Sequence, residues 1–218
     1  MPRSLKYEIP GEDWRRTTVE AAVEGMAELF SPQLERPFEM VLEIGFGRGE
    51  FLLDLAAKEP CTAFLGVEVS FKRTLKMARK LARAGFDNVR LFEARGQVVV
   101  KDLIRKDSLR EIWINFSDPW PKDRHAGRRL IQPDFVRDAA LCLVSGGTLH
   151  VATDDVPYAE QIDPVLASEP LLENAFAPER WLCEVPGRMH TGYEVEWREA
   201  GRPLHFFAYR RRVALEEG

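Results

Sequence analysis

From Met40 onward the sequence repeats a strand, a turn and a helix, and this alternation constrains the fold more than any other feature. Apolar residues fill nearly every position of several short segments, a pattern typical of strands that are covered on both faces. Such strands, separated by amphipathic helices, predict a doubly wound α/β fold with a mostly parallel sheet. The predicted strands are 40–44, 63–69, 89–93, 112–116 and 148–153, the predicted helices are 50–58 and 71–84, and 204–212 is predicted to add an antiparallel C-terminal edge strand.

The first 39 residues differ from the rest. Over 14–30, apolar residues recur at helical spacing, and Pro32 ends the pattern. The apolar positions are Val19, Ala22, Val23, Met26 and Leu29. We therefore expect an N-terminal helical extension over 1–39 and one α/β domain over 40–218, which is long enough to bury a single core.

The composition narrows the class of protein. Hydrophobic residues make up 45% and charged residues 30% of the chain, as in ordinary globular proteins. No apolar run approaches the roughly 20 residues that a membrane helix needs, and no apolar signal core follows the N-terminus, so we expect a cytoplasmic protein without membrane contact. Three cysteines without CxxC spacing predict reduced thiols and argue against a zinc site.

A glycine-rich turn lies between the first predicted strand and the first helix, where α/β sheets bind ligands. Gly45, Gly47 and Gly49 permit a tight turn and a close approach of the backbone to a ligand. A dinucleotide fingerprint would have its third glycine at Glu50, so a nicotinamide oxidoreductase is disfavoured. Glu68, at the end of the second strand, can accept from both hydroxyls of a ribose. S-adenosylmethionine fits this pattern, and the alternative is a turn that only packs a helix onto a sheet.

The segment after the strand 112–116 combines an acid with clustered cations. Asp118 precedes Pro119-Trp120-Pro121, and Lys122, Arg124, Arg128 and Arg129 follow. The net charge of −4 makes this clustering more informative than the overall charge. A carboxylate beside cations suits an enzyme that holds a reacting base and a phosphate backbone. Six more cations recur along 71–84, either as a border of an RNA-binding track or as a solvated helix face: Lys72, Arg73, Lys76, Arg79, Lys80 and Arg83.

Three blocks of the sequence together resemble the tRNA (guanine-N7-)-methyltransferase family. The first is Glu-Ile-Gly-Phe-Gly-Arg-Gly at 43–49, which alone is typical of class I methyltransferases in general. The second and most specific is Phe-Ser-Asp-Pro-Trp-Pro-Lys at 116–122, with the cations that follow it. The third combines 152–154 and 158–160 with Thr-Gly-Tyr-Glu at 191–194. The similarity covers most of 40–212.

This resemblance implies a Rossmann-like, seven-stranded class I methyltransferase fold and a tRNA substrate. The implied reaction moves a methyl group from S-adenosylmethionine to guanine N7 at position forty-six in the variable loop, without a metal, and leaves S-adenosylhomocysteine and 7-methylguanosine. The sequence leaves open whether the enzyme is a monomer or a homodimer. By position, the implied donor-binding residues are Glu43, Gly45, Gly47, Gly49, Glu68, Arg95 and Asp118, and the implied RNA-binding residues are Lys122, Arg124, Asp154, Thr191, Gly192, Tyr193 and Glu194.

One position departs from the family pattern. Arg95 stands where the family usually has an acid that would contact the adenine amino group. We therefore predict that the backbone at Ala94 and Arg95 bonds the adenine edge, with the Arg95 stem packed nearby.

The reaction itself explains the absence of a nucleophile–base pair. Guanine N7 has an in-plane lone pair and no hydrogen, so it needs no general base. Asp118 is the predicted catalytic residue, because its carboxylate can stabilise a purine that becomes cationic and can accept from guanine N1–H and N2–H. Asp154 and Glu194 are further candidates for this edge.

Each of these residues also has a simpler interpretation. Asp118 can begin a turn before a proline, Asp154 can cap a helix that starts near residue 156, and Glu194 can be a surface residue on a strand-like run. Trp120 can be buried packing rather than a platform for guanine, and His125 is assigned no catalysis. At the level of the whole protein, the alternatives are a class I methyltransferase for another RNA base or a small molecule, and a non-catalytic tRNA-binding protein.

Overall fold

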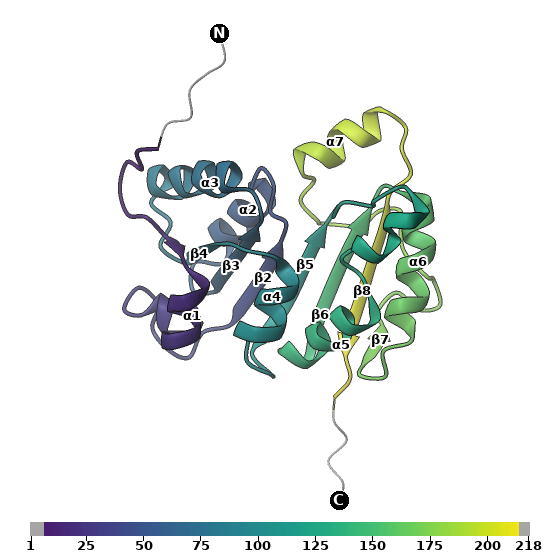
Figure 1. Ribbon diagram of the computed structural model, residues 1–218, viewed down its shortest axis with the longest axis horizontal. Helices are drawn as coiled ribbons and strands as arrows, with labels where there is room; N and C mark the ends of the chain where they lie inside the picture. The colour runs from purple at the N-terminus through teal and green to yellow at the C-terminus, as the bar shows by residue number, and fades with distance from the viewer. Residues whose placement is uncertain (1–6, 214–218) are drawn as a thin grey trace, which may run out of the picture. The chain divides into compact units, whose positions relative to one another are not determined.

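The computed structural model describes residues 7–213, and residues 1–6 of the predicted extension lie outside it. The chain divides into two compact units, Met1–Leu103 and Ile104–Gly218. Figure 1 shows strands flanked by helices in each of them. Among the residues described, no helix has the length and apolar composition required to cross a membrane.

The first unit is built on parallel strands in the order β1-β4-β3-β2. The predicted strands at 40–44 and 89–93 and the predicted helices at 50–58 and 71–84 are confirmed with these bounds. The elements of this part are β1 (Arg15–Arg16), β2 (Met40–Ile44), α2 (Glu50–Lys58), β3 (Ala63–Glu68), α3 (Phe71–Ala84), β4 (Val89–Glu93), α4 (Gly96–Val98) and the π-helix η2 (Val99–Leu103).

The extension does not form the continuous helix that was predicted over 14–30. It contains the short helix α1 (Thr18–Glu24) and the 3-10 helix η1 (Glu28–Phe30). Thr17 and Glu20 form a capping box that begins α1, and Gly25 ends it with a φ of 87° that suits glycine. The predicted apolar face is right for Met26 and Leu29, which are buried, and wrong for Ala22, Val19 and Val23, which are exposed, the last two at 70% and 80%.

A buried arginine packs the extension onto the sheet of the first unit. The guanidinium of Arg90, on β4, lies 4.1 Å from the ring centroid of Trp14 and 4.6 Å from that of Phe30. Its Nε donates to the Leu29 carbonyl at 2.6 Å, and Nη2 donates to Gln33 Oε1 at 2.9 Å. Burial lowers the pKa of Arg90 to about 10, so the side chain stays cationic and its bonds to the extension are charge-assisted.

In the second unit, β5 and β6 are parallel, β8 is antiparallel to β6, and β7 is antiparallel to β8. The segment predicted at 204–212 is antiparallel as expected, but it is not at the edge, because β7 pairs with its other side. Eight strands are described where the resemblance implied seven, and the two-residue β1 is an addition.

The elements of the second unit are β5 (Leu109–Asn115), η3 (Asp123–Arg128), α5 (Pro133–Cys142), β6 (Leu143–Thr153), α6 (Val156–Ala167), β7 (Leu172–Asn174), α7 (Gly192–Glu199) and β8 (His205–Arg211).

Helix α7 packs at the carboxyl end of β5. Phe116, which follows β5, contacts Trp197 of α7 edge to face at 4.7 Å between ring centroids and also faces Phe206 of β8. Ala152, Leu204 and Phe206 form a small buried cluster beneath these rings. The packing places α7 at the end of the second unit's sheet where the Asp118 loop begins (Figure 1).

Candidate active site

The glycine turn of the first unit is shaped by backbone angles that favour glycine. Gly45, Gly47 and Gly49 have φ values of 78°, 52° and 74°. A Cβ at Gly49 would lie 2.3 Å from the Met77 sulfur of α3, so this glycine allows close packing. A Cβ at Gly45 would meet nothing within 4 Å, so open space borders the turn at this residue.

Two buried carboxylates stand on adjacent strands beside this turn. Glu43 of β2 is 2% exposed and Glu68 of β3 is 3% exposed. Glu68 Oε2 accepts from the Gly47 N–H at 3.1 Å, and its Oε1 accepts from the Ser70 N–H at 3.0 Å. Arg73 Nη1 lies 3.4 Å from Oε2. These donors orient the Glu68 carboxylate against the glycine turn, which fits the binding of paired hydroxyls there.

Arg95 is exposed and forms the N-cap of α4. Its carbonyl accepts from the N–H groups of Val98 and Val99 at 3.1 and 3.2 Å. The Ala94 N–H donates to the Glu68 carbonyl at 3.2 Å, and the expected bonding of adenine by the backbone at Ala94 and Arg95 stays a prediction. Gly96 has a packing role, since a Cβ there would lie 2.4 Å from Ile44 Cγ2.

In the second unit, Asp118 is exposed at the start of the loop after β5. Its Oδ1 accepts from the Trp120 N–H at 3.2 Å, so the turn interpretation describes part of what this side chain does. Phe116 and Trp120 both have positive φ, at 56° and 43°. Such backbone strain in bulky residues is concentrated at functional sites, and here it lies on both sides of Asp118.

The cations after Asp118 divide into two groups. Arg129 is buried, and its Nε donates to the Pro119 carbonyl at 2.7 Å while Nη1 donates to Gln161 of α6. Arg129 therefore anchors the loop, and its predicted place beside an RNA-binding track is wrong in this structure. Lys122, Arg124 and Arg128 are exposed.

Trp120 lies among these cations and is half-buried. The Arg128 guanidinium is 5.1 Å from its ring centroid, and the His125 ring meets it edge to face at 5.7 Å. These contacts hold the ring without burying it fully, and its role as a platform for guanine stays a prediction.

Asp154 is not the cap of the next helix. The cap of α6 is Asp155, whose Oδ1 accepts from the Tyr158 N–H at 2.8 Å. Asp154 Oδ2 instead pairs with Arg202 Nη1 at 2.7 Å.

The predicted RNA-binding residues Thr191, Gly192, Tyr193 and Glu194 form the start of α7 rather than a strand-like run. Thr191 caps the helix by accepting from the Glu194 N–H at 3.1 Å. Glu194 is not a surface residue, because it is 0% exposed and its carboxylate accepts from Arg188 and from Arg198, the latter at 3.1 Å. Tyr193 stacks on Trp197 at 5.6 Å between ring centroids.

Comparison with known proteins identifies the family. A family model described as "Putative methyltransferase" matches residues 38–207. The tRNA (guanine-N(7)-)-methyltransferase of Halorhodospira halophila is 36% identical over 199 residues, which cover 91% of this chain and 86% of the relative. The chain belongs to the tRNA (guanine-N7-)-methyltransferase family.

Solved structures of other methyltransferases share the fold of this family member. The 16S rRNA methyltransferase KamB matches with a TM-score of 0.62 and 18% identity, over 85% of this chain and 92% of that one. The geranyl diphosphate C-methyltransferase of Streptomyces coelicolor, solved with S-adenosyl-L-homocysteine, matches with a TM-score of 0.56 and 13% identity, over 89% and 76% of the two chains. At these identities the similarity establishes the α/β class I methyltransferase fold.

Proposed function

We propose that this enzyme transfers a methyl group from S-adenosylmethionine to N7 of guanine in tRNA, at position forty-six of the variable loop. Family membership supports the reaction. The observation that carries the proposal is the exposed Asp118 carboxylate, held between two residues with positive φ and followed by the exposed cations Lys122 and Arg124.

On the donor side, the first unit offers a turn with open space at Gly45 and a carboxylate fixed beside it. We assign Glu68 to the ribose hydroxyls, because both of its oxygens are oriented by backbone N–H groups. Gly45 and Gly47 let the backbone approach the ligand, Gly49 allows α3 to pack behind the turn, and Glu43 and Arg95 complete the proposed donor site.

When bound, S-adenosylmethionine supplies a methyl group on a positively charged sulfur. The protein must hold the guanine in line, an effect that can lower the barrier by roughly 7–11 kcal/mol. It must also stabilise a purine that becomes cationic, and Asp118 carries the charge for this task. The same carboxylate can accept from guanine N1–H and N2–H, which adenine lacks, and this would select guanine. The predicted donor contact of Asp118 stays a prediction.

On the RNA side, Lys122 and Arg124 are assigned to tRNA phosphates, and exposed Arg128 lies next to them. Helix α3 adds a second cationic surface in the first unit, because Leu75, Ala78 and Leu81 are buried as predicted and the cations lie on the opposite face. Asp154 and the start of α7 (Thr191, Gly192 and Tyr193) are retained as residues that shape the RNA-binding surface, whereas buried Glu194 holds the first turn of that helix from within.

The experiment uses an unmodified tRNA transcript and radiolabelled donor. Reduction and aniline treatment cut RNA at 7-methylguanosine, so the modified nucleotide can be mapped directly. We expect one cut, in the variable loop, and no label in a transcript with adenine at that position. Label at another guanine would overturn the assigned position, and a wild-type enzyme that transfers no label to tRNA would overturn the function.

A further inference from the structure

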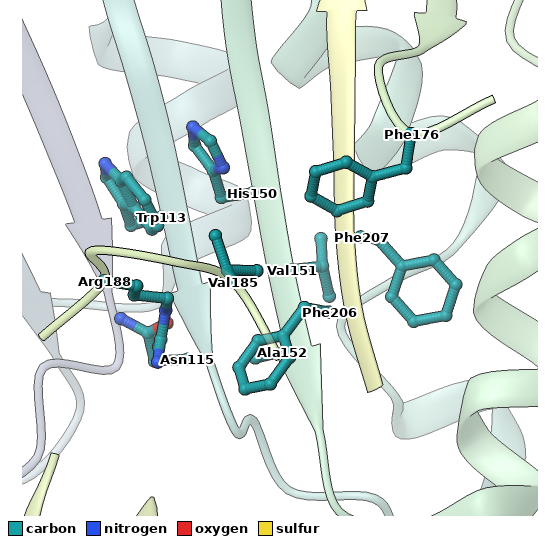
Figure 2. A pocket seen from close by; sticks show the side chains of 10 residues that line it. All are labelled: Trp113, Asn115, His150, Val151, Ala152, Phe176, Val185, Arg188, Phe206 and Phe207. Carbon is teal, nitrogen blue, oxygen red and sulfur yellow. The ribbon is translucent and has the colours of Figure 1, made fainter. Parts of the chain in front are cut away.

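A small cavity of about 90 Å³ lies in the second unit and is lined by residues of β5, β6 and β8 and of the segment that precedes α7. Figure 2 shows its walls, which include the stacked Trp113 and His150, Val185, and the side chains of Asn115 and Arg188. Arg188 is the charged residue of this wall, and its side chain is only 5% exposed.

The Arg188 guanidinium connects two segments that are far apart in the sequence. Its Nη2 donates to Asn115 Oδ1 at 2.8 Å, and its Nη1 donates to Glu194. Its planar face lies 4.8 Å from the ring centroid of Phe206. Asn115 is the last residue of β5, and Glu194 lies in the first turn of α7.

The burial of Glu194 shows how this connection works. A carboxylate with 0% exposure that is bonded to Arg188 and Arg198 presents no surface to a ligand. Its carboxylate instead stabilises the first turn of α7 through these two arginines. The geometry suits arginine, because two nitrogens of one planar guanidinium donate to Glu194 and Asn115 while its face lies over Phe206, whereas the single nitrogen of a lysine ammonium is a compact point charge.

We propose that Arg188 is a positioning residue for methyl transfer. It joins the first turn of α7 to the end of β5, and through Asn115 it sets the path of the loop on which Asp118 stands. The expected effect of Arg188 on kcat rests on the proposed function. The link that Arg188 makes between α7 and β5 can be tested without an activity measurement.

The test compares Arg188→Ala and Arg188→Lys with Arg137→Ala, an exposed arginine on α5 that contacts only Asp134 and Asp138 among the pairs described. Misplacement of reacting groups by about 1 Å can cost roughly 100-fold in rate. We expect Arg188→Ala to lower kcat by about 10- to 100-fold, Arg188→Lys to restore little of it, and Arg137→Ala to leave it unchanged.

Chemical rescue separates positioning from general loss of structure. Removal of the side chain enlarges the cavity, so guanidinium chloride well below denaturing concentrations should restore part of kcat in Arg188→Ala, whereas equal sodium chloride or urea should not. In parallel, amide hydrogen exchange should become faster in both α7 and 115–120 and slow again with guanidinium.

Normal kcat in Arg188→Ala, or full activity in Arg188→Lys, would overturn the proposal. So would exchange that rises evenly across the second unit without any guanidinium effect. If the wild-type enzyme methylates no tRNA, the proposed function fails, and the exchange measurement still decides whether Arg188 couples α7 to β5.

Discussion

In the first unit, the acids Glu43 and Glu68 are buried on adjacent parallel strands, whereas Asp118 in the second unit is exposed on a loop. Glu68 is fixed by backbone N–H groups of residues that lie close to strand ends. In the second unit, Arg129 donates to the Pro119 carbonyl and to Gln161 of α6, and Arg188 donates to Asn115 at the end of β5, just before the Asp118 loop. The Glu68 carboxylate is thus oriented by backbone groups near it, whereas the loop that carries Asp118 is bonded through arginine side chains.

Asp118→Asn tests the exposed half of this comparison most strongly. The amide keeps the turn bond to the Trp120 N–H but removes the charge that stabilises a cationic purine, so kcat should fall by about 100-fold or more. Single-turnover methylation of tRNA measures this effect. Asp134→Asn, an exposed acid on α5, is the matched control and should leave the rate unchanged. Wild-type turnover in Asp118→Asn would remove the proposed catalytic role.

Glu68→Gln tests the role of the buried carboxylate in the first unit. An amide cannot accept with both of its terminal atoms, and a lost charge-assisted hydrogen bond costs about 1.5–3 kcal/mol, so the Kd of the donor should rise by about 10- to 100-fold. Calorimetric titration with S-adenosylhomocysteine measures it, while tRNA affinity should stay constant. Glu24→Gln, on the exposed face of α1, serves as the control. An equal loss of tRNA affinity would show that the proposed donor-binding residues and the proposed RNA-binding residues do not act separately.

The pH dependence of stability should come from the second unit, which contains every histidine of the chain. Burial, with a smaller contribution from the Arg188 charge, lowers the pKa of His150 to about 3. The unfolded chain binds this proton below about pH 6.5 and the folded protein does not, so stability falls as the pH drops from about 6.5 toward 3. The slope from this group is at most about 1.4 kcal/mol per pH unit.

Urea unfolding between pH 7 and pH 5 measures this slope. In His150→Phe, which can keep the ring stack on Trp113, the slope should flatten. Identical slopes in the variant and the wild type would show that His150 is not the responsible group.

The cations of the Asp118 loop give the smallest expected effect. Each phosphate contact contributes about 0.9 to the slope of log affinity against log salt for duplex regions. Lys122→Ala and Arg124→Ala should each reduce the slope for tRNA by about this amount and weaken binding to all tRNAs alike. Lys106→Ala provides an exposed control in the same unit. An unchanged slope in both loop variants would exclude them from the RNA-binding surface.

The sequence predicted the first unit in detail because its signals are local. Continuous apolar runs and helical spacing identified β2, β4, α2 and α3 with their observed bounds. The error over 14–30 has a local cause as well, since Gly25 ends α1 and the residue that α1 buries is Ala21 rather than Val19.

The buried arginines that hold the loop after β5 and the start of α7 in the second unit could not be predicted in the same way. Arginine is rarely buried without a partner, and partners that are 6 and 73 residues away from Arg188 leave no periodic signal. Arg188 and Arg129 were therefore missed as structural residues, and Glu194, predicted as a candidate for the guanine edge, is fully buried and bonded to Arg188. Charged residues close to proposed functional segments are the positions where a single sequence is least informative.

The most direct test of the central claim uses tRNA in which the variable-loop guanine is replaced by 7-deazaguanine. This base keeps the N1–H and N2–H edge but has a carbon in place of N7. The account predicts tRNA binding within about twofold of the unmodified substrate, since a loss below about 0.4 kcal/mol is expected when the bonded edge is retained, and no methyl transfer at that nucleotide. Methyl transfer to the 7-deazaguanine would contradict attack by N7 and, with it, the role assigned to Asp118.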